Sequence, residues 1–330
     1  MKIGLILPQG FFNEFEGWPA DRAWLRMAEI ARLAESLGFD SLWTGEHVLA
    51  RYGGTSPAFD CFTVASALAA TIPRVGIGFI VLNSTFRNPV LTAKAAATLD
   101  AVSGGRLVLG LGAGFIEAEA RALGVEYPPL GERLHQLEEY FATISRLTSA
   151  DHEKLTFEGR YARAEDAVNH PHGVQRPHIP LLIGGHGPRL TYRIAAKYCD
   201  EININVRPAE LPLALEQLHA RCAGVGRDPA TLAIAASVLP GWPFRGLKST
   251  GGHHMTSQED LSAAGTVTDL SALPTRAEEL VTWRELGVER LMCGIPGLAN
   301  TDETMYEFLD DCEAAGMPLI RPSTSRQSSN

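Results

Sequence analysis

The stretch Glu35-Ser36-Leu37-Gly38-Phe39-Asp40-Ser41-Leu42-Trp43 joins the end of an expected helix to the start of an expected strand through a glycine turn and an acidic residue. The pattern returns near the end of the chain as Arg284-Glu285-Leu286-Gly287-Val288-Glu289-Arg290-Leu291-Met292, and residues 195–203 hold a looser copy. Glycine after a helix is common because it adopts the left-handed backbone that ends the helix. Junctions of one kind at both ends of a chain indicate a repeated helix–strand unit.

Short apolar runs alternate with helical segments on both sides of this junction, and such runs are typical of buried parallel strands. Eight strands are expected, at residues 2–7, 41–44, 75–82, 106–111, 179–183, 201–206, 232–239 and 289–293. Helices are expected at about residues 21–37, 60–71, 89–102, 131–147, 189–197, 208–223, 275–286 and 301–315. Right-handed crossovers close eight such α/β units into a (β/α)₈ TIM barrel. An open doubly wound sheet has the same alternation and is the alternative.

Insertions are expected after the fourth and the seventh strands. Residues 155–162 suggest a small hairpin, and residues 242–269 are rich in glycine and serine. The second insertion follows a strand end, where barrel enzymes carry active-site loops, so it is interpreted as a lid or as an insertion without a role. Residues 1–320 are expected to form a single domain, and the polar residues 321–330 a disordered tail.

Composition narrows the classes of partner. The chain has 330 residues and a formal net charge of −9, which disfavours binding to nucleic acid or to an anionic membrane surface. Its five cysteines form no Cys-x-x-Cys pair, which argues against a disulfide framework and favours a cytoplasmic location. The N-terminal apolar run is too short for a signal peptide, and no stretch approaches the roughly 18 apolar residues of a membrane span.

Polar residues and glycines follow most of the expected strands, and in a barrel these strand ends meet at one face. Glu46-His47 follows the second strand, and a histidine there can transfer a proton near neutral pH with a carboxylate beside it. Gly184-Gly185-His186-Gly187 follows the fifth strand and precedes a helix. Its glycines would let backbone N–H groups approach a phosphate, although a tight turn also explains them.

Other motifs carry less weight. Residues 110–114 resemble a dinucleotide-binding fingerprint, but Phe115 occupies the position of its last glycine, so Gly112 is interpreted as a strand end against which a cofactor or loop packs. His253-His254 has no Cys or carboxylate partner at helical spacing, and no metal site is expected. No nucleophile-elbow or phosphate-loop motif supports a hydrolase or a nucleotide triphosphatase.

Taken together, these phrases resemble the luciferase-like superfamily, and especially its branch that uses the deazaflavin coenzyme F420. Ser103-Gly104-Gly105-Arg106, which leads into the fourth strand, is particularly specific. The matching stretches are residues 38–47, 88–94, 99–114, 180–185 and 280–293. The resemblance therefore covers most of the chain, with no family pattern in residues 242–269.

The resemblance implies roles for individual residues. Glu46 and His47 fall where family members place an acidic residue and a histidine beside the reactive ring. Ile80 and Val81 fall where many deazaflavin enzymes hold a non-proline cis peptide under the ring, and Asn83 is placed at the polar edge of the ring. The remaining positions, Gly184, Gly185, His186 and Gly187, match the phosphate-binding turn. Phe115 departs from the family's sugar-phosphate dehydrogenases, which carry a catalytic Glu there, and suits a more apolar substrate.

These observations predict an oxidoreductase that transfers a hydride between coenzyme F420 and a small organic substrate, with His47 handling a proton. The alternative is an FMN-dependent monooxygenase that receives reduced FMN from a separate reductase. A barrel without cofactor that serves only for binding is a third interpretation, which the retained Glu46-His47 pair and the glycine turn disfavour. Family barrels often pair, so a homodimer is also expected.

Overall fold

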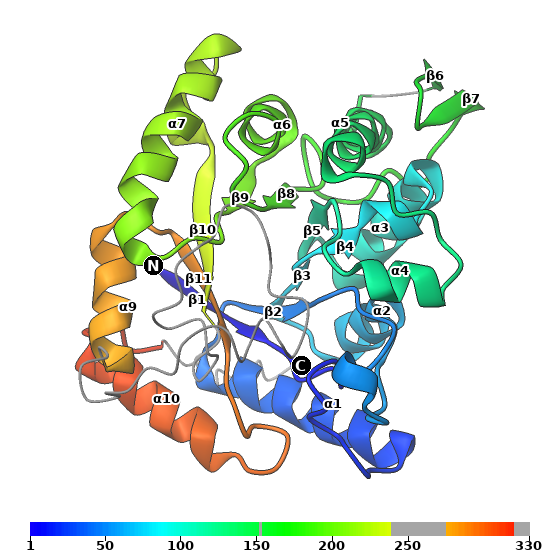
Figure 1. The fold of residues 1–330 in the computed structure, drawn as a ribbon. Helices are drawn as coiled ribbons and strands as arrows, with labels where there is room; N and C mark the ends of the chain where they lie inside the picture. The colour runs from blue at the N-terminus through cyan, green and yellow to red at the C-terminus, as the bar shows by residue number, and fades with distance from the viewer. Residues whose placement is uncertain (152–153, 239–274, 320–330) are drawn as a thin grey trace, which may run out of the picture.

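The computed structural model describes residues 1–151, 154–238 and 275–319. A closed barrel of eight parallel strands lies at its centre, surrounded by helices (Figure 1). The strands are β1 (Lys2–Ile6), β2 (Ser41–Thr44), β3 (Gly76–Phe79), β5 (Leu107–Gly112), β8 (Leu181–Gly184), β9 (Glu201–Asn203), β10 (Ala233–Val238) and β11 (Arg290–Gly294). Because β3 pairs with β5 and β1 pairs with β11, no barrel strand is left at an edge. The predicted TIM barrel is confirmed, and the open doubly wound sheet is wrong.

The helices form the outer layer around the barrel (Figure 1). They are α1 (Ala20–Leu37), α2 (Cys61–Thr71), α3 (Pro89–Ser103), α4 (Glu117–Ala122), α5 (Leu130–Leu147), α6 (Thr191–Tyr198), α7 (Leu211–Gly224), α9 (Arg276–Glu285) and α10 (Glu303–Ala314). Gly38 ends α1 with a φ of 92°, as the repeated junction predicts. In the described residues, no helix is long and apolar enough to cross a membrane.

The expected insertion after the fourth strand is confirmed. Besides the barrel helix α5, the segment between β5 and β8 holds the short helix α4 and an antiparallel hairpin of β6 (Leu155–Glu158) and β7 (Arg163–Ala167). The hairpin stands outside the barrel (Figure 1) and extends beyond the expected residues 155–162. The predicted lid at residues 242–269 and the predicted tail at 321–330 lie outside the described residues.

Most strands differ from their expected ranges by one or two residues at an end, and two strands differ by more. The third strand stops at Phe79, passes through a cis peptide between Ile80 and Val81, and resumes as β4 (Leu82–Asn83), which pairs with β5. The sequence predicts a sixth strand that runs to residue 206, but β9 ends at Asn203. The chain turns there, with the N–H of Val206 donating to the carbonyl of Ile204 at 3.1 Å.

The barrel interior is filled around Trp43. Its side chain packs with Leu182 and Met292 from strands on other sides of the barrel. Glycines on both neighbouring strands make room for the indole. A Cβ at Gly4 would lie 2.5 Å from Trp43 Nε1, and a Cβ at Gly78 would lie 2.3 Å from Trp43 Cζ3. The part of the barrel interior around Trp43 is thus a packed core.

A charged cluster closes the N-terminal end of the barrel. Arg290, the first residue of β11, forms ion pairs with Asp40 and with Glu201, the latter at 2.9 Å. Its guanidinium also donates to Ser41 Oγ at 3.0 Å and lies 5.5 Å from the centre of the Trp43 ring. We call Arg290, Asp40, Glu201 and Ser41 the basal cluster.

Candidate functional site

The C-terminal ends of the strands form the mouth of the barrel, and the cis peptide lies at its floor. The N–H of Ile80 donates to the carbonyl of Thr44 at 2.8 Å, and the carbonyl of Val81 accepts from the N–H of Glu46 at 3.3 Å. These bonds join the end of β3 to the segment after β2. The cis peptide that the family resemblance implied is therefore present at the expected position.

Two of the predicted glycines lie against Val81. A Cβ at Gly112 would come within 2.6 Å of Val81 Cγ2, and a Cβ at Gly184 would lie 3.0 Å from Val81 Cγ1. Both positions must therefore stay small for the segment after β3 to reach over the barrel. The structure brings Val81, Gly112 and Gly184 together at the centre of the mouth.

Glu46 is a buried carboxylate that holds the segment after β2 against β4. One oxygen accepts the N–H of Asn83 at 2.6 Å, and the other pairs with Arg87. Arg87 also lies 3.7 Å from Asp60 and over the ring of Phe62. Burial would lower the pKa of Arg87, but the hydrogen bond and charge of Glu46 outweigh it, so this pKa is raised and the guanidinium stays protonated.

Asn83 occupies the rim beside Glu46. Its side-chain oxygen accepts from the N–H of Thr85 at 3.1 Å and from the Thr85 hydroxyl at 2.8 Å. The amide also lies against Gly114, where a Cβ would be 2.6 Å from Asn83 Oδ1. Asn83 therefore sits between β4 and the end of β5, and its position is set by its own turn.

His47 lies at the rim with its ring enclosed on three sides. Phe11 stacks on it with ring centres 3.5 Å apart and an interplanar angle of 13°, while Phe115 approaches edge-on at 5.6 Å. Glu119 lies on the third side, with Oε2 3.2 Å from Nδ1 of the imidazole. The side chain of His47 remains 18% exposed, so it can meet a small molecule in the mouth.

The glycine turn connects β8 to α6. Gly185 has a φ of 135°, and its N–H donates to the carbonyl of Asn203 at 3.0 Å. Thr191 packs against the turn, since a Cβ at Gly187 would lie 2.7 Å from its hydroxyl oxygen. Burial lowers the pKa of His186, against an opposing effect of Glu210. The turn ends at the N-terminus of α6, where no side chain caps the helix.

Several residues of the mouth were not among the predicted site residues. Glu119 contacts His47, Arg87 pairs with Glu46, Phe11 covers the His47 ring, and Thr191 supports the glycine turn. Asn203 also belongs to the mouth, where its amide donates to Ser237 Oγ at 2.9 Å. The sequence places the Glu119 carboxylate five residues beyond Gly114, close to a strand end, but carries no signal for its contact with His47.

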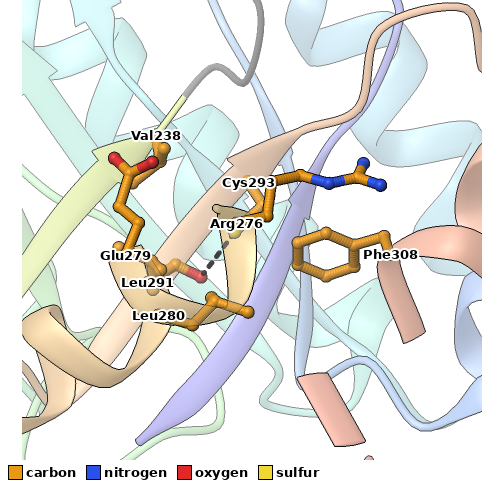
Figure 2. A pocket seen from close by; sticks show the side chains of 7 residues that line it. All are labelled: Val238, Arg276, Glu279, Leu280, Leu291, Cys293 and Phe308. Atoms are coloured by element: carbon orange, nitrogen blue, oxygen red, sulfur yellow. Dashed lines mark hydrogen bonds between the residues drawn. The ribbon is translucent and has the colours of Figure 1, made fainter. Parts of the chain in front are cut away.

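A small cavity elsewhere in the molecule is too small to bind a substrate or cofactor. It lies between β10, β11 and the helices α9 and α10 (Figure 2), and its volume is about 10 Å³, close to the space of one water molecule. Cys293 and Arg276 line it. Burial raises the pKa of Cys293 well above its ordinary value, so the sulfur is held as an unreactive thiol.

The fold and the mouth define a class: a (β/α)₈ barrel with a non-proline cis peptide, a carboxylate-bound histidine and a glycine turn at the strand ends. Residues 1–241 match the family described as luciferase-like monooxygenase. The chain belongs to this family, which confirms the resemblance read from its sequence.

Relatives and solved structures agree with this assignment. The chain is 38% identical over 178 residues to an F420-dependent glucose-6-phosphate dehydrogenase of Microbacterium testaceum, a match that covers 52% of this chain and 51% of that protein. The chain spans about half to two thirds of the length of the curated relatives it matches.

Two of the solved structures with a similar fold illustrate the likeness. An F420-dependent secondary alcohol dehydrogenase in complex with an F420-acetone adduct has a TM-score of 0.76 at 20% identity, covering 95% of this chain and 98% of that one. A monooxygenase, RslO1 of Streptomyces bottropensis, has a TM-score of 0.67 at 22% identity, covering 93% and 97%. At these identities the likeness concerns the fold alone.

Proposed function

We propose that the chain is an oxidoreductase that exchanges a hydride between coenzyme F420 and a small organic substrate. The observation that carries the proposal is the position of His47, held at the rim by Glu119 and Phe11, together with the apolar floor that Val81 forms between Gly112 and Gly184. F420-dependent proteins among the relatives and among the solved structures support this choice of cofactor.

The residues of the mouth fit a flat aromatic cofactor with a phosphate-bearing tail. Val81 presents a smooth apolar floor, because its neighbours Gly112 and Gly184 carry no side chain. Asn83 would meet the polar edge of the ring. The N–H of Gly185 is already engaged by Asn203, so His186, Gly187 and the start of α6 would hold the phosphate. When bound, the deazaflavin supplies hydride chemistry that no side chain can supply.

The chain's own groups position the reactants and move a proton. We assign the proton to His47, whose imidazole can accept it from an alcohol or donate it to a carbonyl oxygen. Both oxygens of Glu46 are engaged, by the N–H of Asn83 and by Arg87. In this proposal Glu46, expected from the sequence to be catalytic, holds Asn83 and the floor in place.

The rim of the mouth favours an apolar substrate. Phe115, which is 39% exposed, stands beside His47, and Leu49 and Phe12 are also partly exposed near it. Phe115 occupies the position where the resemblance places a catalytic Glu in sugar-phosphate dehydrogenases. We therefore propose a small secondary alcohol or carbonyl compound in place of a sugar phosphate.

The test is a comparison of two cofactors on the purified full chain. Fluorescence titration with coenzyme F420 and with FMN should give tighter binding of F420, followed by turnover with a panel of alcohols, enones and imines. Tighter binding of FMN, together with oxygen uptake in the presence of reduced FMN, would instead support the monooxygenase, which the likeness to RslO1 keeps as the second candidate. That outcome would also call for a separate reductase as a partner.

A further inference from the structure

Glu119 connects two regions of the mouth that are far apart in the sequence. It belongs to α4, which follows β5, and it contacts the segment that follows β2. One carboxylate oxygen accepts the N–H of Val48 at 2.6 Å and the N–H of Leu49 at 3.3 Å. The other lies 3.2 Å from Nδ1 of His47. The carboxylate is 5% exposed, so these protein groups fix its orientation.

The contacts of Glu119 and Phe11 together determine how the imidazole is presented. Phe11 stacks on the ring at 3.5 Å and fixes its plane, while Glu119 fixes the rotation of the ring within that plane. An ionised carboxylate only accepts hydrogen bonds, so Nδ1 must carry the proton in the contact with Glu119. In the neutral imidazole the lone pair is then left on Nε2.

We propose that Glu119 is a positioning residue that fixes the Nδ1–H tautomer of His47 and so makes Nε2 the nitrogen that exchanges a proton with the substrate. This inference rests on the proposed function. When an alcohol is oxidised, its O–H bond breaks as an N–H bond forms at Nε2, and the hydride from its carbon goes to the F420 of the proposed function. In carbonyl reduction the same proton returns from Nε2 to oxygen.

Glu119→Gln separates positioning from packing. The amide has nearly the volume of the carboxylate, and its oxygen can still accept the N–H groups of Val48 and Leu49. Its NH₂ group then faces Nδ1 of His47 and can only donate to it. The proton must move to Nε2, which removes the lone pair from the nitrogen that faces the substrate.

The tautomer is read directly by ¹⁵N NMR of the histidine side chains in the full chain, without cofactor. The chain has ten histidines, so the His47 signals are identified by their loss in His47→Ala. We expect a protonated Nδ1 in the parent protein and a protonated Nε2 in Glu119→Gln. A protonated Nε2 in the parent would overturn the proposal, and this measurement remains decisive even where the variant does not fold.

Kinetics supply the second measurement. Glu119→Gln should lower kcat about 10²-fold or more, the lower range of general acid–base contributions, while KM and the affinity for the cofactor stay close to those of the parent. Glu119→Asp should restore part of kcat together with the parent tautomer. Glu117→Gln, on the same helix with an exposed side chain paired to Arg121, is the matched control and should leave tautomer and kcat unchanged.

The two proposals fail in distinguishable ways. If F420 does not bind but the tautomer inverts in Glu119→Gln, the proposed function falls and the positioning role stands. If F420 binds and turns over while Glu119→Gln keeps both the parent tautomer and its kcat, Glu119 is only a structural anchor and the inference is overturned.

Discussion

The two ends of the barrel each hold a buried group of charges built on the second strand, but in different ways. At the N-terminal end, the basal cluster joins residues on or directly before the first positions of β2, β9 and β11. At the mouth, Glu46 and His47 follow β2 and find their partners, Arg87 and Glu119, beyond the strands.

The two ends differ in the groups that pair with their charged side chains. In the basal cluster, Arg290 pairs with two carboxylates and a hydroxyl, so its charge is satisfied within the strands of the barrel. At the mouth, Glu119 contacts one imidazole nitrogen of His47, and in the proposed function the other nitrogen meets the substrate. The pairs carried by strands therefore belong to the barrel itself, whereas Glu119, carried by a short helix beyond a strand, contacts the residue that we propose to be reactive.

The largest expected effect is on activity at the mouth. His47→Ala should lower turnover about 10²–10⁴-fold, because a positioned acid–base group contributes that much to rate. The affinity for the cofactor should fall much less, since the floor at Val81 and the glycine turn remain. Turnover, cofactor binding and melting temperature are measured together, with His219→Ala on the outer face of α7 as control. Unchanged turnover with a large loss of melting temperature would make His47 a structural residue.

The corresponding change at the other end should affect stability alone. Arg290→Met leaves Glu201 and Asp40 without their buried counter-charge, and breaking such a pair costs about 3–5 kcal/mol of unfolding free energy. The measurement is urea unfolding, followed by cofactor titration under conditions where the variant is folded.

A surface variant near the same carboxylate shows how much of the stability loss in Arg290→Met comes from burial of the ion pair. Lys2→Met removes an exposed cation 3.9 Å from the same Asp40 and should cost less than about 1 kcal/mol. A large loss of cofactor affinity in folded Arg290→Met would show that the two ends are coupled, and the contrast between them would fail.

Gly185→Val in the glycine turn should lower cofactor affinity more than it lowers the stability of the fold. Valine at Gly185 meets a φ of 135° and brings its Cβ within 3.3 Å of Thr191, so the turn must shift and displace the N–H groups of the residues after it. We expect a 10–100-fold loss of cofactor affinity, because one hydrogen bond to a charged group contributes about 1.5–3 kcal/mol.

Gly226→Val is the matched control, with a φ of 72° and no atom within 4 Å of the new Cβ. It should strain the backbone to a similar degree without changing affinity. Equal affinity losses in the two variants would place the phosphate elsewhere.

The barrel could be predicted from the sequence because each strand is a short apolar run and each junction repeats, as at Gly38 and Gly287. The break at Ile80-Val81 could not be derived from those runs, since residues 75–82 form one continuous apolar stretch. Its cis peptide was implied only by the family resemblance.

The mouth was predicted in part. Glu46, His47 and the glycines stand next to strand ends, where position alone marks them. Their partners were missed for a physical reason: Glu119 lies 72 residues from His47, and a contact across two strands leaves no spacing signal in the sequence. The helix α4 was missed as well, because its six residues are too few to show an apolar period.

The smallest expected effect is the change in folding stability as pH falls. A group at the mouth and a group in the basal cluster should change it in opposite directions. Burial lowers the pKa of His186 below its ordinary 6.5, so the unfolded chain binds a proton that the folded protein resists, and stability falls as pH drops through about 6.5. Burial raises the pKa of Glu201 above 4.5 despite Arg290, so the folded protein takes up a proton before the unfolded chain does. This group therefore adds stability as pH falls toward 4.5.

His186→Gln should therefore reduce the loss of stability between pH 8 and pH 5.5, measured as the change in urea midpoint. His219→Gln, an exposed substitution on α7, should leave that loss unchanged. If the urea midpoint changes with pH by the same amount in the parent and in His186→Gln, His186 has the same pKa in the folded and unfolded chains. The predicted loss of stability at the mouth on acidification would then be wrong.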